Sequence, residues 1–452
     1  MKALLPVKCK VSLKDVAISI PDTLKEWPVS SIAFGTLQYS CKPSYHAGGT
    51  LYVSKKIYEE LMLPYEGKIH LFVHEDVLHL GPLIGIFTAG FTNSIVRPIG
   101  ERTLFFSKLL ATEKKVGAYV FLFGANHINW EEGTMEGYMF SDEGWCRKKL
   151  PFPHVVYDRL PNRRTEKHKL LSETREKIQK DYAIPWFNPG FFNKWDIHQK
   201  LKIEESIVPY LPETSNNVTI EKMEEYLAHY PFIYVKPMNG SLGHGVYKII
   251  YDREKGLYYV RFKNAELHNK LMRFSSLETL LGTVMKNKDL SGFIIQQGIP
   301  LLKKNDSHVD FRVHTNKDDN GKWMVSAMAA KLSGKGSVTT HMNSGGVVKT
   351  LSELFPDEVD HVDVTQKLTQ ASLLISEAID THLPGFIGEI GFDFGMDKEK
   401  RIWLFEANSK PGRSIFYHPK LRNEDILTRK LSIEYAVYLT EKSIKYPDGI
   451  FS

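Results

Sequence analysis

The sequence is short of cysteine and has no long apolar run. Its three cysteines, Cys9, Cys41 and Cys146, are odd in number and far apart, which argues against a disulfide framework. Because no CxxC pair occurs, we do not expect a structural zinc site. The most apolar stretch, residues 81–91, is far shorter than the roughly 20 residues that a membrane-spanning helix needs. The first ten residues carry no signal-peptide core, so we expect a soluble protein of the cell interior without membrane insertion.

A clear excess of charge of one sign is also missing. The 59 Lys and Arg residues against 53 Asp and Glu residues give a net charge of +6, a small excess for 452 residues. The basic residues are spread along the chain and no known nucleic-acid module is present, so we expect no nucleic-acid partner. Hydrophobic residues make up 42% and charged residues 25%, which is typical of a globular protein. At about 150 residues per domain, the length predicts about three domains.

Two changes of pattern divide the chain into three expected domains. Residues 1–80 have short apolar runs between Gly and Pro turns, which predicts a small β-rich domain with one helix from Ser54. Residues 81–184 follow a strand–helix–strand order that is typical of a parallel α/β unit, and the charged segment 161–182 predicts one amphipathic helix. Residues 185–452 alternate long strands and helices, and the short turns between strands predict a largely antiparallel α+β arrangement.

The first candidate site is a glycine-rich turn between two predicted strands. One strand ends at Lys236, and the turn contains Gly240, Ser241, Gly243 and Gly245. Glycines let backbone N–H groups approach phosphate oxygens closely, and the nearby lysine adds positive charge. The turn leads to a strand and no GK[ST] follows, so it is not a Walker loop. A plain β-hairpin explains the same residues, and both interpretations stay open.

The second candidate site is a set of oxygen donors on a predicted hairpin. Asp393 lies near the end of one strand among phenylalanines, and Glu406 and Asn408 lie two residues apart, hence on one face of the next strand. Such oxygens suit hard cations, and Mg²⁺ needs few protein ligands because it keeps waters and binds substrate phosphates. The alternative is a surface hairpin with scattered acids, although an acid among aromatic residues is costly unless it is paired.

A third candidate is Arg312, which shares one face of a predicted strand with His314. An arginine on an inner strand suits the recognition of phosphate or carboxylate groups. A structural Arg–Asp pair is the alternative interpretation of the same residue.

Taken together, these segments resemble the ATP-grasp superfamily over roughly residues 185–440. The resemblance implies an ATP-grasp fold in which ATP lies between two α+β lobes, preceded by an α/β pre-ATP-grasp domain. It implies that phosphates are bound by Lys194, Lys236, Gly240, Ser241, Gly243 and Gly245, that adenine is met by Gln296, Gln297 and Ile299, that Arg312 binds phosphate or an intermediate, and that one or two Mg²⁺ ions are held by Asp393, Glu406 and Asn408.

At closer range the phrases GPLIGIFT, VKPMNGSLGHGVYKI and FDFGMD resemble the YheC/YheD group of Bacillus-type spore-associated proteins. The length and the β-rich segment before Gly81 are more similar to the YheD type. This resemblance implies a cytoplasmic protein of the sporulating cell that associates with the endospore coat, with coat proteins as partners. It implies no particular substrate.

The resemblance implies an ATP- and Mg²⁺-dependent ligase that joins a carboxylate to an amine or a thiol through an acyl phosphate. Arg312 and Lys236 are then the expected catalytic residues. Two alternatives stay open. An ATP-grasp kinase would transfer phosphate to an acceptor from the same nucleotide site, and a structural coat protein would retain only a vestigial nucleotide site.

Overall fold

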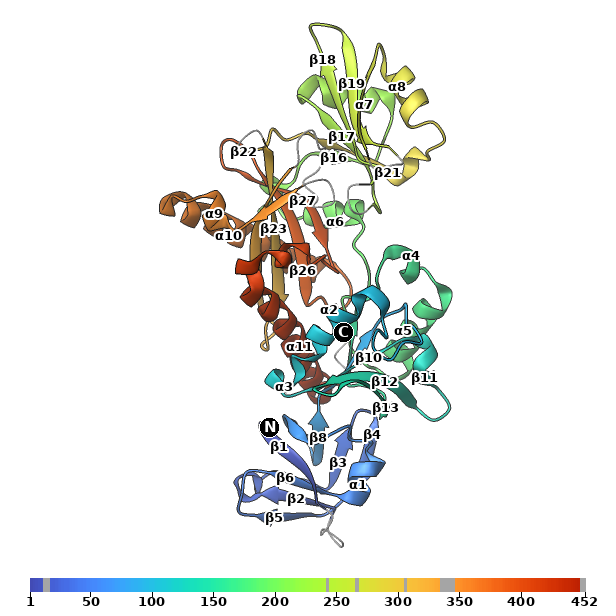
Figure 1. The fold of residues 1–452 in the computed structure, drawn as a ribbon, viewed down its shortest axis with the longest axis vertical. Coiled ribbons are helices and arrows are strands. Elements are labelled where there is room, and N and C mark those ends of the chain that lie inside the picture. The colour runs from blue at the N-terminus through green and yellow to red at the C-terminus, as the bar shows by residue number, and fades with distance from the viewer. Residues whose placement is uncertain (11–16, 241–243, 265–267, 305–306, 334–345, 448–452) are drawn as a thin grey trace.

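The computed structural model describes residues 1–10, 17–240, 244–264, 268–304, 307–333 and 346–447. Four sheets follow one another along an elongated molecule (Figure 1). The sheet of residues 2–81 forms one end of the long axis, and the sheet of residues 214–297 forms the other. Within the described ranges, no helix is both long enough and apolar enough to cross a membrane.

The N-terminal part is a mixed sheet with one short helix, as the turn-rich pattern predicts. Helix α1 (Lys55–Glu60) begins directly after Ser54, whose hydroxyl accepts a hydrogen bond from the Ile57 amide at 3.4 Å. The predicted helix start is therefore confirmed. In spatial order the strands are β4 (Leu37–Ser40), β3 (Ser31–Phe34), β8 (Val77–Gly81), β7 (Gly67–His74), β1 (Lys2–Lys10), β6 (Leu51–Ser54), β2 (Ile18–Pro21) and β5 (Pro43–His46).

The second sheet has a parallel centre, as predicted. Strands β9 (Leu83–Phe87), β10 (Tyr119–Phe123) and β14 (Val155–Asp158) are buried along their whole length, which is typical of parallel strands covered on both faces. The sequence pattern did not predict the antiparallel hairpin of β12 and β13. The remaining elements are α2 (Thr103–Leu110), α3 (Glu113–Val116), β11 (Ile128–Asn129), β12 (Thr134–Ser141), β13 (Gly144–Pro151) and β15 (Trp186–Phe187).

Two details of this region differ from the sequence expectation. The segment 161–182 forms two helices, α4 (Arg163–Glu166) and α5 (Lys169–Asp181), because His168 adopts an extended conformation between them. One apolar cluster also includes Phe34 of the first sheet and Trp186 of the second, so the two sheets share a core. The boundaries at residues 80 and 184 stay predictions.

The rest of the chain forms two antiparallel lobes, which confirms the α+β prediction. Helix α6 (Lys194–Leu201) precedes the first lobe in the chain but packs into the core of the second lobe through Ile197 and Leu201. The first lobe contains β16 (Thr214–Ser215), α7 (Ile220–His229), β17 (Ile233–Pro237), β18 (Tyr247–Asp252), β19 (Leu257–Lys263), β20 (Asn269–Phe274), α8 (Leu277–Val284) and β21 (Phe293–Gln297). The second contains β22 (Lys303–Lys304), β23 (Ser307–Lys317), β24 (Trp323–Leu332), β25 (Val347–Lys349), α9 (Leu351–Leu354), α10 (Glu358–His382), β26 (Glu389–Met396), β27 (Ile402–Asn408) and α11 (Arg422–Lys445).

Asn188 ties the end of the second sheet to the second lobe. Its side-chain amide donates to the carbonyl oxygens of Glu389 at 2.8 Å and Ser409 at 2.5 Å. Its side-chain oxygen accepts from the amides of Gly388 at 2.9 Å and Glu389 at 3.2 Å. The residue is fully buried with a φ of 55°, a left-handed conformation that Asn tolerates better than most residues.

We expect Asn188→Ala to lower the free energy of unfolding by about 3 kcal/mol or more, because it leaves buried backbone groups without hydrogen-bond partners. The measurement is urea unfolding followed by circular dichroism. The control is Asn217→Ala, since Asn217 is exposed. Equal unfolding midpoints for the two variants would contradict the prediction.

Candidate functional site

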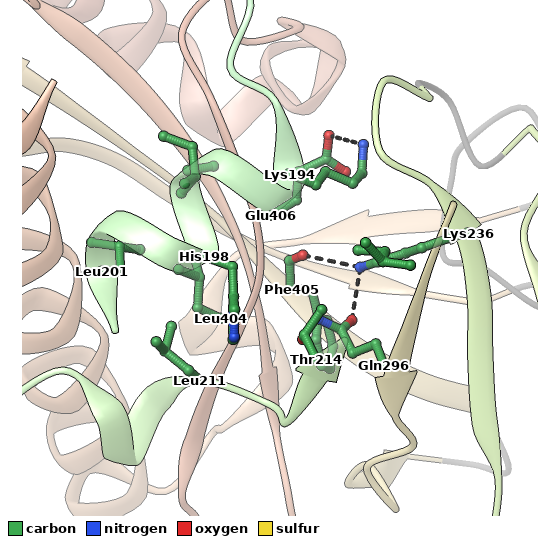
Figure 2. A pocket seen from close by; sticks show the side chains of 13 residues that line it. Lys194, His198, Leu201, Leu211, Thr214, Lys236, Gln296, Leu404, Phe405 and Glu406 are labelled. Atoms are coloured by element: carbon green, nitrogen blue, oxygen red, sulfur yellow. Dashed lines mark hydrogen bonds and ion pairs between the residues drawn. The ribbon is translucent and has the colours of Figure 1, made fainter. Parts of the chain in front are cut away.

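A small cavity lies where strands β17 and β21 of the first lobe meet helix α6 and strand β27 of the second lobe (Figure 2). Lys194, Lys236 and Glu406 line it from three of these elements, so residues that are far apart in the sequence come together here. The complete lining is Lys194, Ile197, His198, Leu201, Leu211, Thr214, Lys236, Ile294, Gln296, Leu404, Phe405, Glu406 and Ala407.

Lys194 joins the two lobes at the rim of this cavity. The Asn193 side chain accepts hydrogen bonds from the next backbone amides and fixes the start of α6, so Lys194 is its first residue. Its ammonium donates to the carbonyl oxygen of Gly240 at 2.6 Å and pairs with the Glu406 carboxylate at 3.0 Å. The predicted phosphate lysine therefore contacts the glycine-rich turn and a predicted metal ligand at once.

Lys236 is a buried cation at the floor of the cavity. Its ammonium donates to the Gln296 side-chain oxygen at 2.7 Å and to the Phe405 carbonyl oxygen at 3.3 Å (Figure 2). Burial, and then the positive charge of Lys194, lower the pKa of Lys236 to about 8, although the carboxylates of Glu406 and Asp393 oppose the shift. Among the described residues, Lys236 now donates to neutral oxygens only, so an anionic ligand would be a stronger partner for its ammonium.

Of the predicted adenine contacts, only Gln296 reaches the cavity lining. Its side-chain amide nitrogen donates to the Thr214 hydroxyl at 3.1 Å. The backbone amide of Gln297 donates a hydrogen bond to the Glu213 carbonyl oxygen at 2.8 Å. Ile299 is buried and does not line the cavity. Residues Ser241 and Gly243 lie outside the described part of the chain. Gly245 follows the gap with a φ of 70°, and β17 and β18 flank the turn as an antiparallel pair, as the sequence predicts.

His198 is a lining residue that the sequence reasoning missed. Burial, followed by the positive charges of Lys202 and Lys236, lowers its pKa to about 4. The imidazole is therefore neutral near pH 7. It adds a polar but uncharged edge to the otherwise aliphatic side of the cavity.

The three predicted metal ligands lie on neighbouring strands, β26 and β27. Asp393 is the register partner of Glu406, and Asn408 is the partner of Gly391, so the three residues share one face of the sheet. Their oxygens are hard donors of the kind that Mg²⁺ prefers. Among the described residues, no group of three His, Cys, Asp or Glu side chains gathers to hold a metal. The donor set fits Mg²⁺ if the amide oxygen and substrate phosphates complete the coordination.

Cations already pair with the Asp393 carboxylate. Arg312 donates to one of its oxygens at 2.9 Å, and Lys331 of β24 donates to the other at 2.7 Å. Burial would lower the pKa of Lys331, but the carboxylates of Asp310 and Asp393 outweigh it and raise the pKa. The second guanidinium nitrogen of Arg312 is buried and has no hydrogen-bond partner in the described structure. Arg312 can therefore pair with Asp393 through one nitrogen and bind an oxyanion through the other.

Lys331 is the other residue that the sequence reasoning missed. It lies in an apolar strand, and only the register of β23 and β24, which places Asp310 opposite Lys331, brings its charge to the site. The cavity itself has a volume of about 30 Å³. Since small-molecule sites usually enclose about 300 Å³ or more, a nucleotide requires the two lobes or their side chains to move apart.

Comparison with known proteins places this geometry in context. Residues 183–439 match the family model described as "YheC/D like ATP-grasp". The endospore coat-associated protein YheD of Bacillus subtilis is 44% identical over 96% of this chain and 95% of its own length. The endospore coat-associated protein YheC of the same organism is 24% identical over 61% of this chain and 75% of its own length. The match confirms the ATP-grasp fold and the group that the sequence motifs indicate.

Solved structures with a similar fold include ligases. D-alanyl-alanine synthetase A from Vibrio cholerae is 13% identical, with a TM-score of 0.45 over 79% of this chain and 99% of that protein. The VanG D-Ala:D-Ser ligase from Enterococcus faecalis is 12% identical, with a TM-score of 0.47 over 79% of this chain and 99% of that protein.

We expect Lys236 to lose its proton near pH 8 rather than near the ordinary lysine value of 10.5. Because the charge disappears as the pH rises through this value, attraction for a phosphate weakens above pH 8. Competitive labelling with acetic anhydride between pH 6 and 11, read by mass spectrometry, measures the midpoint. Lys236→Met identifies the labelled peptide. A midpoint above pH 10 would contradict the expected shift.

Proposed function

The chain belongs to the YheC/D-like ATP-grasp family, and from this premise we propose that it is an ATP- and Mg²⁺-dependent ligase that joins a carboxylate to an amine or a thiol. The observation that carries the proposal is the convergence of Lys194, Lys236 and Glu406 on one cavity between the two lobes. Two cations and a metal-ligand candidate in one buried place match the charges of a metal-bound triphosphate.

The lysines and the glycine-rich turn would hold the phosphates of ATP. Lys194 already contacts the Gly240 carbonyl oxygen, so its ammonium lies at the mouth of the turn. Within the described structure, the Lys236 ammonium donates hydrogen bonds only to neutral oxygens, and it gains an ionic partner when phosphate arrives. The bound nucleotide would in turn favour the charged form of Lys236 and raise its pKa.

Asp393, Glu406 and Asn408 would hold Mg²⁺, which neutralises phosphate charge during transfer. Binding requires both carboxylates to leave their present cations, at least in part. Lys194 would then be released from Glu406, and Arg312 and Lys331 would be released from Asp393. Lys194, Arg312 and Lys331 would then be available to stabilise the negative charge of the phosphates.

The carboxylate of the substrate would attack the γ-phosphate and form an acyl phosphate, with ADP as the leaving group. Arg312 would stabilise the developing negative charge through its guanidinium, one nitrogen of which is free of hydrogen bonds in the described structure. An amine or thiol would then attack the acyl carbon and displace inorganic phosphate. The sequence of steps requires no covalent nucleophile from the protein.

One observation favours a second candidate, a coat protein whose site no longer turns over. The cavity is small, and its Lys194 ammonium already pairs with its Glu406 carboxylate. Such a pair compensates both charges without any ligand. Nucleotide binding distinguishes this candidate from the ligase.

We also propose an association with the endospore coat, since the relative that is 44% identical is an endospore coat-associated protein. The test is to follow a tagged copy in a sporulating host. We expect the tag in the coat extract of purified spores. Its recovery only in the mother-cell cytoplasm would argue against the association.

We expect Glu406→Gln to weaken the affinity for Mg²⁺·ATP about 10-fold or more, because it removes a charged metal ligand. Isothermal titration calorimetry measures this affinity. The matched control is Glu399→Gln, since Glu399 is exposed in the turn of the same hairpin and does not line the cavity. A wild-type protein that binds no nucleotide would overturn the enzyme proposal in favour of the coat protein.

The fate of the γ-phosphate separates a ligase from a kinase. We expect ³¹P NMR of reactions with candidate acids and amines to show free inorganic phosphate that accumulates with ADP. Phosphate that stays attached to the acceptor would identify a kinase instead.

A further inference from the structure

Three arginines meet at the junction between the second sheet and the second lobe, outside the cavity of Figure 2. Arg159 directly follows β14, Arg102 directly precedes α2, and Arg413 follows β27. The Arg159 amide donates to the Phe87 carbonyl oxygen at 2.9 Å, so this arginine lies at the carboxyl ends of the parallel strands β9 and β14. Open α/β sheets bind ligands at this edge.

Aromatic rings hold the three guanidinium groups. The Phe105 ring centroid is 5.1 Å from the guanidinium of Arg159 and 5.8 Å from that of Arg413. The neighbouring Phe106 ring lies 5.4 Å from the guanidinium of Arg102. Helix α2, which carries both rings, lies beside the second lobe in Figure 1. The arginines are thus fixed from both sides of the junction.

The positive charge of this cluster exceeds its negative charge. The Glu389 carboxylate pairs with Arg159 at 3.0 Å and with Arg413 at 3.6 Å, and Asp425 also pairs with Arg413, at 2.7 Å. Within the described structure, the Arg102 side chain donates only to neutral oxygens, the Thr88 hydroxyl at 2.9 Å and the Ala89 carbonyl. Burial, and then the charge of Arg159, lower the pKa of Arg102. Because the positive charges repel one another in this half-buried place, the binding of an anion between them would be favourable.

A polar face connects this cluster with the metal-ligand candidates. Along β23, Arg312, His314 and Asn316 alternate onto one face, and across β26 they oppose Asp393, Gly391 and Glu389 respectively. His314 is fully buried, and neither ring nitrogen has a hydrogen-bond partner in the described structure.

The spacing along this face separates two positions. Glu389 lies four residues from Asp393 on β26, which corresponds to roughly 13 Å along the strand. A group bound beside Glu389 is therefore not the group that reacts beside Asp393.

We propose that Arg102, Arg159 and Arg413 bind an anionic group of a substrate, a carboxylate or a phosphate, at a point remote from the reacting group. The guanidinium fork of Arg102 is the main contact, because it has no carboxylate partner among the described residues. The substrate is therefore acidic at a position other than its reacting end. That the bound group belongs to a substrate rests on the proposed ligase function, whereas the anion site itself does not.

The test uses equilibrium binding to the full chain at constant ionic strength. Glutarate and inorganic phosphate are the anionic probes, and glutaramide is the neutral match for glutarate. We expect an anionic probe to bind and glutaramide not to bind, and the tighter of the two anions tells carboxylate from phosphate. Arg102→Gln should weaken the anion about 10-fold or more, with Mg²⁺·ATP affinity unchanged. Arg97→Gln is the control, because Arg97 is exposed on the same loop.

Glu389→Gln gives a second, opposite readout. It removes the internal carboxylate from Arg159 and Arg413, so the anion should bind more tightly. A purely structural role of the cluster would not produce this gain. Equal binding of glutarate, phosphate and glutaramide, or unchanged anion affinity in Arg102→Gln, would overturn the inference. Anion binding without Mg²⁺·ATP binding would instead overturn the proposed function and leave the anion site in place.

Discussion

The ion pair between Lys194 and Glu406 is the contact around which the polar groups of the candidate site are arranged. Both residues of this ion pair belong to the second lobe, and the same ammonium reaches the first lobe by donating to the carbonyl oxygen of Gly240. In a half-buried cleft an unpaired charge is costly, and Lys194, Arg312 and Lys331 each pair with a carboxylate within reach. The protein thereby provides internal substitutes for the charges that we expect a metal-bound nucleotide to bring.

The same principle explains the rest of the polar face. Asp393 is held by Arg312 and Lys331 beside the candidate metal position, and Glu389 is held by Arg159 beside the pre-ATP-grasp sheet. Replacing an internal ion pair with a contact to a charged ligand costs less free energy than leaving the two charges unpaired, because the ligand makes up for each lost ion pair. Both clusters lie on β26. This strand therefore runs from the candidate phosphate site to the site that we propose for a substrate anion.

Much of this arrangement could be predicted because it depends on short-range periodicity. The two-residue repeat places Glu406 and Asn408 on one face, and the hairpin turn makes Asp393 the neighbour of Glu406. Lys331 and Arg102 could not be found in this way. Lys331 reaches Asp393 only through the register of β23 and β24, and Arg102 approaches Arg159 only after the second sheet has formed. The break between α4 and α5 was missed because charged residues continue through it without a Gly or Pro.

The central claim is that metal and nucleotide replace the internal ion pairs. A crystal structure with Mg²⁺ and a non-hydrolysable ATP analogue tests it most directly. The account predicts Mg²⁺ on Asp393, Glu406 and Asn408, phosphate oxygens at Lys194 and Lys236, and a Lys194–Glu406 distance well beyond the present 3.0 Å. A nucleotide bound elsewhere, or bound here with the ion pair between Lys194 and Glu406 intact and no metal on the carboxylates, would contradict it.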